Sequence, residues 1–151
     1  MCECMQKLTI FLIIFFYFGN LLSKEDYFLT LRNDKVNLRQ GPSFDYPVKI
    51  FYKMKYLPVI IQDSSNNFRK VRDHENNSGW IHISQLSKKK AAIVIEDELI
   101  MFSNSTIYSN PIALLKKGRL VKIKKCKENW CRAVTEDFKG WIKKESLWGL
   151  L

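Results

Sequence analysis

Two cysteines near the C-terminal end are the residues whose type and spacing most directly predict a covalent bond. Cys126 and Cys131 flank residues 127–130, four residues that can form a hairpin loop. Directly opposed positions of an antiparallel strand pair lie about 4.5 to 5.5 Å apart, which is within the range that a disulfide bridges. The spacing therefore predicts a disulfide, provided that the chain is exported to an oxidising compartment.

Other chemical roles for the reactive side chains find less support in the sequence. The Cys-x4-Cys spacing differs from the redox motif Cys-x-x-Cys. A zinc site would need more ligands than the C-terminal half supplies, since His74 and His82 both lie in the other half of the exported chain. A nucleophilic Cys131 would need a histidine that only tertiary packing could bring. Residues 96–98 form an acidic turn that we expect to face solvent. Because no paired carboxylates, Gly-rich phosphate loop or nucleophile elbow appear either, we expect no catalytic residue, metal or cofactor.

The N-terminal segment predicts export. Residues 8–18 are apolar and uncharged, as in a secretory signal, and even the longest apolar stretch of 15 residues is below the roughly 18 expected of a transmembrane helix. We expect a cleaved signal peptide over residues 1–23, with an uncleaved N-terminal anchor as the alternative. Translation from Met5 would also give a complete signal and would remove Cys2 and Cys4 from the protein.

The charge of the exported part indicates an anionic partner. After residue 23 the chain keeps 24 of its 25 basic and 14 of its 15 acidic residues, so the net charge stays at +10. Residues 24–90 carry +6 and residues 91–151 carry +4. Such a spread favours general attraction to anionic surfaces, such as lipid headgroups or wall polymers, over one docking patch, and export argues against nucleic acid. A lysine-rich coding bias with solvated side chains is the alternative.

The elements that must position these residues are strands. Short runs rich in Val, Ile, Phe and Tyr are separated by clusters of Gly, Asn, Asp, Ser and Pro, and no amphipathic helix of useful length appears. Residues 58–63 predict a strand, residues 64–67 a turn, residues 68–73 the hairpin partner and residues 79–83 a third strand. A meander of this size needs closure or a second layer to bury its face.

The same pattern occurs twice along the chain. Gly79-Trp80-Ile81 matches Gly140-Trp141-Ile142, and a leucine follows each tryptophan by six residues. Phe68-Arg69-Lys70-Val71 corresponds to Trp130-Cys131-Arg132-Ala133. The offsets of 61 and 62 residues define an internal repeat, which indicates two copies of one small unit.

A polar joint at residues 87–90 divides the copies into units of residues 27–87 and 91–149. Domains of about 60 residues bury only about 60% of their unfolded surface, so each would be marginally stable alone. We therefore expect the two units to pack together. Residues 91–95, a continuous apolar run, are expected to bridge them because such runs are buried on both faces.

The motifs of both copies resemble the bacterial SH3-like domain family. Residues 36–43, Val-Asn-Leu-Arg-Gln-Gly-Pro-Ser, look like the opening strand and first turn of that family. Residues 68–73, residues 79–82 and Leu86 resemble its central hairpin and closing strand. Residues 130–132, 140–142 and 147–149 resemble the second half of its exported two-repeat subgroup. The resemblance implies an all-β fold of two tandem small SH3-like β-barrels after the signal peptide, in a cell-envelope protein.

Two departures from the family pattern make the copies unequal. Phe68 stands where the family usually has Trp, and in the second copy residues 101–105, Met-Phe-Ser-Asn-Ser, replace the Asn-x-Arg-x-Gly-Pro opening. A ligand groove built from that opening would therefore exist in the first copy.

These observations favour a non-catalytic, exported, periplasmic or envelope-associated binding module. The expected partner is peptidoglycan or another wall polymer, recognised by the first copy; an envelope protein–protein adaptor or structural subunit is the alternative. The residues that flank the loops at one end of the first copy are the candidate contacts. These are Arg39, Tyr46, Arg72 and His74.

Overall fold

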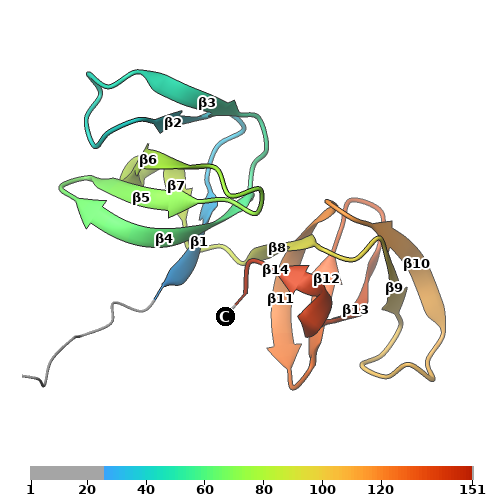
Figure 1. Ribbon diagram of the computed structural model, residues 1–151. Coiled ribbons are helices and arrows are strands. Elements are labelled where there is room, and N and C mark those ends of the chain that lie inside the picture. Colours follow the sequence, from blue (N-terminus) through green and yellow to red (C-terminus); the bar gives the residue numbers. More distant parts are fainter. Residues whose placement is uncertain (1–25, 151) are drawn as a thin grey trace, which may run out of the picture.

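The computed structural model describes residues 26–150, and the predicted signal peptide lies outside this range. These residues form two all-β repeats that lie side by side (Figure 1). No helix among them is long and apolar enough to cross a membrane.

Repeat 1 is a seven-stranded antiparallel sheet with the strand order β3-β2-β6-β5-β4-β1-β7. Its strands are β1 (Tyr27–Leu31), β2 (Val36–Arg39), β3 (Val48–Tyr52), β4 (Pro58–Ser65), β5 (Phe68–Arg72), β6 (Ser78–His82) and β7 (Leu86–Ser87). A 3₁₀ turn, η1 (Ile83–Gln85), joins β6 to β7. The predicted all-β fold in two units is confirmed. The ladders described for residues 26–150 leave β3 and β7 at opposite ends of the order, so they do not close the bent sheet into a barrel.

Repeat 2 has the same order, β10-β9-β13-β12-β11-β8-β14. Its strands are β8 (Ala91–Val94), β9 (Glu98–Phe102), β10 (Pro111–Lys116), β11 (Leu120–Lys127), β12 (Trp130–Val134), β13 (Lys139–Lys143) and β14 (Leu147–Trp148), with the 3₁₀ turn η2 (Lys144–Ser146) before β14. The matching order shows that the sequence repeat is a structural repeat.

The central hairpins extend further toward their turns than the sequence suggested. β4 runs through Ser65 and leaves Asn66 and Asn67 as the turn, and β11 runs through Lys127 and leaves residues 128–129. Asn66 and Glu128 have φ angles of 47° and 53°, the left-handed conformation that two-residue hairpin turns require. Both predicted four-residue turns were therefore two residues too long. The turn at 64–67 loses its first two residues to β4, and the turn at 127–130 loses one residue to each flanking strand.

This register places the two cysteines opposite each other. Cys126 pairs with Cys131 across β11 and β12, their Cα atoms are 4.0 Å apart, and they form a disulfide. The predicted bond is confirmed. The Cys131 side chain is buried in the core of repeat 2, while Cys126 is exposed.

Removing this disulfide should cost stability. We expect the double substitution Cys126→Ser and Cys131→Ser to lower the free energy of unfolding of repeat 2 by about 2 kcal/mol, because the cross-link restricts the unfolded chain. Urea denaturation of the variant beside the wild type measures this loss. The wild type with a reductant should lose about 2 kcal/mol, and the variant at least as much, because it also places a hydroxyl at the buried position 131. Unchanged stability in both would contradict the expectation.

Strand β8 joins the two repeats. Ala92 and Val94 belong to the core of repeat 2, whereas Ile93, which points to the other face of the strand, belongs to the core of repeat 1. All four residues of β8 are buried. The expectation that this apolar run bridges the repeats is confirmed, and strand alternation is its physical cause.

Further contacts at the joint come from the C-terminal end. The Trp148 ring lies 5.0 Å from that of Phe28 in an edge-to-face arrangement and 5.9 Å from that of His74. Gly149 has a φ of 120°, and a side chain there would meet Pro58 of repeat 1 at 2.8 Å. The last strand of repeat 2 therefore lies directly against repeat 1.

Candidate functional site

A cluster of three rings lies on the surface of repeat 1, where the β2–β3 loop meets the central strands. Phe68 on β5 and His82 on β6 are register partners, and their ring centroids are 5.1 Å apart. Phe44, from the loop, covers both at 5.2 Å and is 64% exposed, whereas Phe68 is 6% exposed. We call Phe44, Phe68 and His82 the aromatic face.

Arg39 holds the loop that carries Phe44. Its Nη1 donates hydrogen bonds to the carbonyl oxygens of Phe44 at 3.0 Å and Tyr46 at 2.8 Å, and its guanidinium carbon lies 5.4 Å from the centroid of the Phe44 ring. The Tyr46 ring packs on Gly41, where an added Cβ would come within 2.6 Å of the ring. Arg39 and Tyr46, both predicted contacts, therefore lie together and order the loop, which lowers the entropy cost of binding through it.

The other two predicted contacts lie at the end of β5 and in the β5–β6 loop: Arg72 is the last residue of β5, and His74 is in the loop. Arg72 Nη1 donates to Asn76 Oδ1 at 2.8 Å, and the His74 ring faces Trp148 of repeat 2. Arg72 and His74 therefore contact other residues than Arg39 and Tyr46 do. The four residues form two separate pairs, of which only one borders the aromatic face.

A buried carboxylate fixes the β5–β6 loop. Asp73, which is 1% exposed, accepts hydrogen bonds from the Tyr52 hydroxyl, from the backbone N–H groups of Glu75 and Asn77, and from the Asn77 side chain, at 2.8 to 3.0 Å. Burial, followed by the hydrogen bond to Asp73, raises the pKa of Tyr52 above its usual value, so its hydroxyl stays a donor. This network could not be predicted from the sequence pattern, because it forms between strand β3 and a distant loop.

Sequence reasoning did not select Phe44, and it considered His82 only as a zinc ligand. The internal repeat could have drawn attention to His82, because the two copies differ at this position. His82 lies three residues after Gly79, and Lys143 lies three residues after Gly140. Phe44 lies in a loop without periodicity, so nothing in the pattern distinguished it from a solvated ring.

Repeat 2 carries a different surface at the matching position. Trp130 and Lys143 are register partners there, and the Phe102 ring, which replaces Arg39, lies 5.8 Å from that of Trp130 at 84°. The Lys143 ammonium pairs with the Glu145 carboxylate at 3.3 Å. This repeat therefore lacks the arginine-held loop, as expected from the loss of the opening motif.

Across residues 26–150, no group of three or more His, Cys, Asp and Glu side chains could hold a metal ion. The chemistry available at the aromatic face is ring stacking, hydrogen bonding by His82 and contact with apolar groups.

The two strongly bent sheets have the same strand order. Each has an aromatic residue on the fifth strand of its repeat and a glycine on the sixth. These features define a tandem SH3-like protein. The sequence model of the bacterial SH3 domain matches residues 32–88 and 96–149, most of the chain, and this protein belongs to that family. Domains of this family are often cell-wall binding modules and are generally non-catalytic. Family membership and the disulfide together indicate a protein outside the cytoplasm.

Comparison with solved structures found similar chains in NlpC2 and NlpC1 from Trichomonas vaginalis. The NlpC2 structure is 16% identical in sequence, with 83% of this chain and 48% of that chain covered and a TM-score of 0.38. The corresponding values for NlpC1 are 15%, 85%, 48% and 0.37. This chain spans about half the length of these two proteins. Comparison with curated proteins found no significant match.

Proposed function

We propose that this protein is an exported, non-catalytic cell-envelope module that binds peptidoglycan or another wall component through the aromatic face of repeat 1. The observation that carries the proposal is Phe44, an exposed ring supported by Phe68 and His82 on a loop that Arg39 holds. Exposed, preorganised rings bury large apolar area at low entropy cost, which is how contact anchors act in binding sites. Sugar rings and peptide stems offer matching apolar faces.

Sedimentation with purified peptidoglycan sacculi tests this proposal. We expect the full-length protein, kept in non-ionic detergent, to co-sediment, and Phe44→Ala to bind about tenfold more weakly, a loss of about 1.4 kcal/mol. Phe51→Ala is the matched control, because Phe51 is 68% exposed but lies on β3 outside the aromatic face. Equal losses for both variants, or a wild type left in the supernatant, would refute the proposal, with unchanged melting temperatures showing that the variants fold.

An envelope adaptor is the second candidate, and the surface of repeat 2 favours it. Leu114 on the edge strand β10 and its register partner Ile100 on β9 are 51% and 43% exposed. An edge strand with apolar neighbours can accept a strand from another protein. Cross-linking in cells that captures one stoichiometric protein partner, dependent on Leu114, would support this function in place of wall binding.

A further inference from the structure

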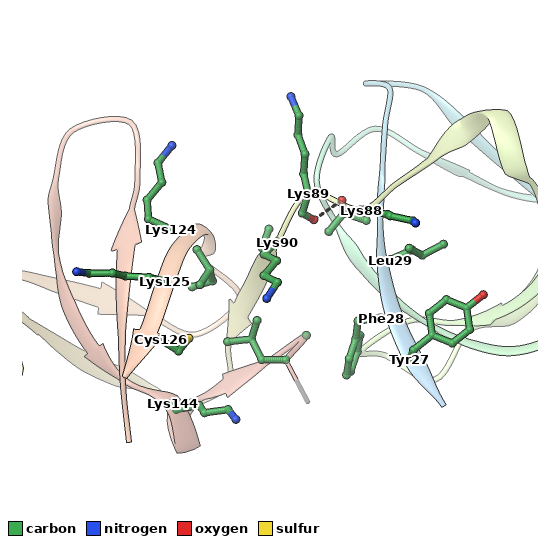
Figure 2. Close-up of a pocket in the computed structure, with 15 residues that line it drawn as sticks. Tyr27, Phe28, Leu29, Lys88, Lys89, Lys90, Lys124, Lys125, Cys126 and Lys144 are labelled. Carbon is green, nitrogen blue, oxygen red and sulfur yellow. Dashed lines mark hydrogen bonds between the residues drawn. The ribbon is translucent and has the colours of Figure 1, made fainter. Parts of the chain in front are cut away.

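A groove between the two repeats gathers lysines from three separate segments of the chain. Its walls are β1 of repeat 1 and β11 of repeat 2, and the linker and the C-terminal end close it (Figure 2). The volume is about 740 Å³, within the range of ligand sites, about 300–1,000 Å³. Among the described residues that line it, six are lysines and none is Asp or Glu. These are Lys88, Lys89, Lys90, Lys124, Lys125 and Lys144.

The linker lysines are held in place by their backbone. The Lys89 carbonyl accepts a hydrogen bond from the buried Thr30 hydroxyl of repeat 1 at 2.8 Å, and the Lys90 carbonyl accepts one from the Ile123 N–H of repeat 2 at 2.9 Å. Both repeats therefore fix the linker. Figure 2 shows the Lys90 side chain in the space between the repeats, which leaves its ammonium available to a ligand.

A β-bulge supplies the lysines of the opposite wall. The register of β11 against β12 shifts between Ile123 and Lys125, so Lys124 is the extra residue. Bulges of this kind redirect side chains and are frequent beside functional sites. Repeat 1 has the same bulge between Ile61 and Asp63, with a neutral Gln62 as its extra residue, so the basic wall is specific to repeat 2.

Among residues 26–150, no acidic side chain forms an ion pair with a lysine of the groove. The ion pairs among residues 26–150 involve Lys116, Lys117 and Lys143, and none of these lines the groove. Two groove lysines instead approach rings, Lys89 at 5.5 Å from Tyr56 and Lys125 at 5.7 Å from Trp141. Lys90, Lys124 and Lys144 remain to meet an external anion.

We propose that this groove is a second binding site, which takes an acidic polysaccharide, a glycan chain carrying sulfate, phosphate or carboxylate groups. In Figure 2, Lys124 lies in the upper part of the view, Lys90 near the centre and Lys144 in the lower part, a distribution that fits an extended chain with several anionic groups. The apolar side chains of Phe28 and Leu150 line the same groove and can pack against sugar rings. A concave groove suits a chain better than the flat surface of a bilayer. This site is independent of the aromatic face.

Titration of the full-length protein in non-ionic detergent with dextran sulfate, beside neutral dextran, tests the proposal. We expect dextran sulfate to bind at 50 mM salt and neutral dextran not to bind. The triple variant Lys90→Gln, Lys124→Gln, Lys144→Gln should bind at least tenfold more weakly. A plot of log affinity against log salt should also be less steep for this variant. Its negative slope should shrink in magnitude by about 2, because each of the three lost contacts accounts for ~0.7, the value for single-stranded nucleic acids.

A charge-matched control separates the groove from the general positive charge. The triple variant Lys35→Gln, Lys70→Gln, Lys139→Gln removes three exposed lysines outside the groove and should lose less than threefold in affinity. An equal loss in both triple variants would overturn the proposal. It would also be overturned if dextran sulfate failed to bind while vesicles with anionic lipid bound through the groove lysines. Phe44→Ala should keep dextran sulfate binding, so failure of this site and failure of the aromatic face are distinguishable.

Discussion

Substitution of Ile93 by alanine is expected to destabilise both repeats, although the residue belongs to only one of them. Ile93 lies on β8, a strand of repeat 2, but its side chain is 1% exposed and packs in the core of repeat 1. Removing three carbons from a buried isoleucine costs about 2–5 kcal/mol, through lost burial and the cavity left behind. A repeat of about 60 residues is only marginally stable, so we expect repeat 1 to lose most of its free energy of unfolding.

Hydrogen exchange of individual amides measures this effect in each repeat. Exchange should accelerate in β4 and β5 of repeat 1 as well as in β8 and β11 of repeat 2. Ile95→Ala is the matched control, since Ile95 is two residues away and 43% exposed, and it should cost less than about 1 kcal/mol. Acceleration confined to repeat 2 would mean that the repeats are not coupled through β8.

Substitution of Gly79 by alanine is the second large expected effect. A Cβ at this position would lie 2.6 Å from the Arg39 carbonyl oxygen and 2.7 Å from Leu38 Cγ, because β6 crosses β2 at close range there. A backbone oxygen cannot rotate away, so we expect a loss of about 2–3 kcal/mol, near the upper end of overpacking costs. Gly140→Ala in repeat 2, which would approach Phe102 O and Met101 Cγ at 2.6 Å, should cost a similar amount.

Thermal and urea denaturation of the two glycine variants measure these losses. Ser78→Ala, at the residue beside Gly79, is the control and should change stability by less than about 0.5 kcal/mol. A Gly79→Ala protein as stable as the wild type would show that β2 and β6 can separate without cost, against the packing described above.

Much of the fold could be predicted because it depends on local patterns. Turn residues and apolar runs marked the central hairpin of each repeat, the glycine and tryptophan spacing defined the repeat, and the Cys-x4-Cys spacing predicted the disulfide. The continuous apolar run of residues 91–95 predicted the bridge, because burial on both faces leaves that pattern. The turn lengths were wrong because positive φ angles at Asn66 and Glu128 allow tighter turns than the composition suggested.

The candidate site was less predictable because it depends on tertiary contacts. Arg39 was selected as a ligand contact, but its two hydrogen bonds to loop carbonyls were not foreseen. The charge count along the chain suggested a diffuse basic surface, whereas folding brings Lys90, Lys124 and Lys144 to one groove. A linear count cannot detect such convergence, since the three lysines come from a linker, a bulge and a 3₁₀ turn.

The most direct test of wall binding by repeat 1 is a nuclear magnetic resonance titration of the isotope-labelled protein with soluble disaccharide-peptide fragments of peptidoglycan. Our proposal predicts that chemical shifts change at the amides of Gln40, Gly41 and residues 43–46 and at those of Phe68 and His82, with the ring signals of Phe44 changing most. The change should persist at 0.5 M salt, because ring stacking is not screened as charge attraction is. Shift changes confined to repeat 2, or none at millimolar fragment, would contradict the proposal.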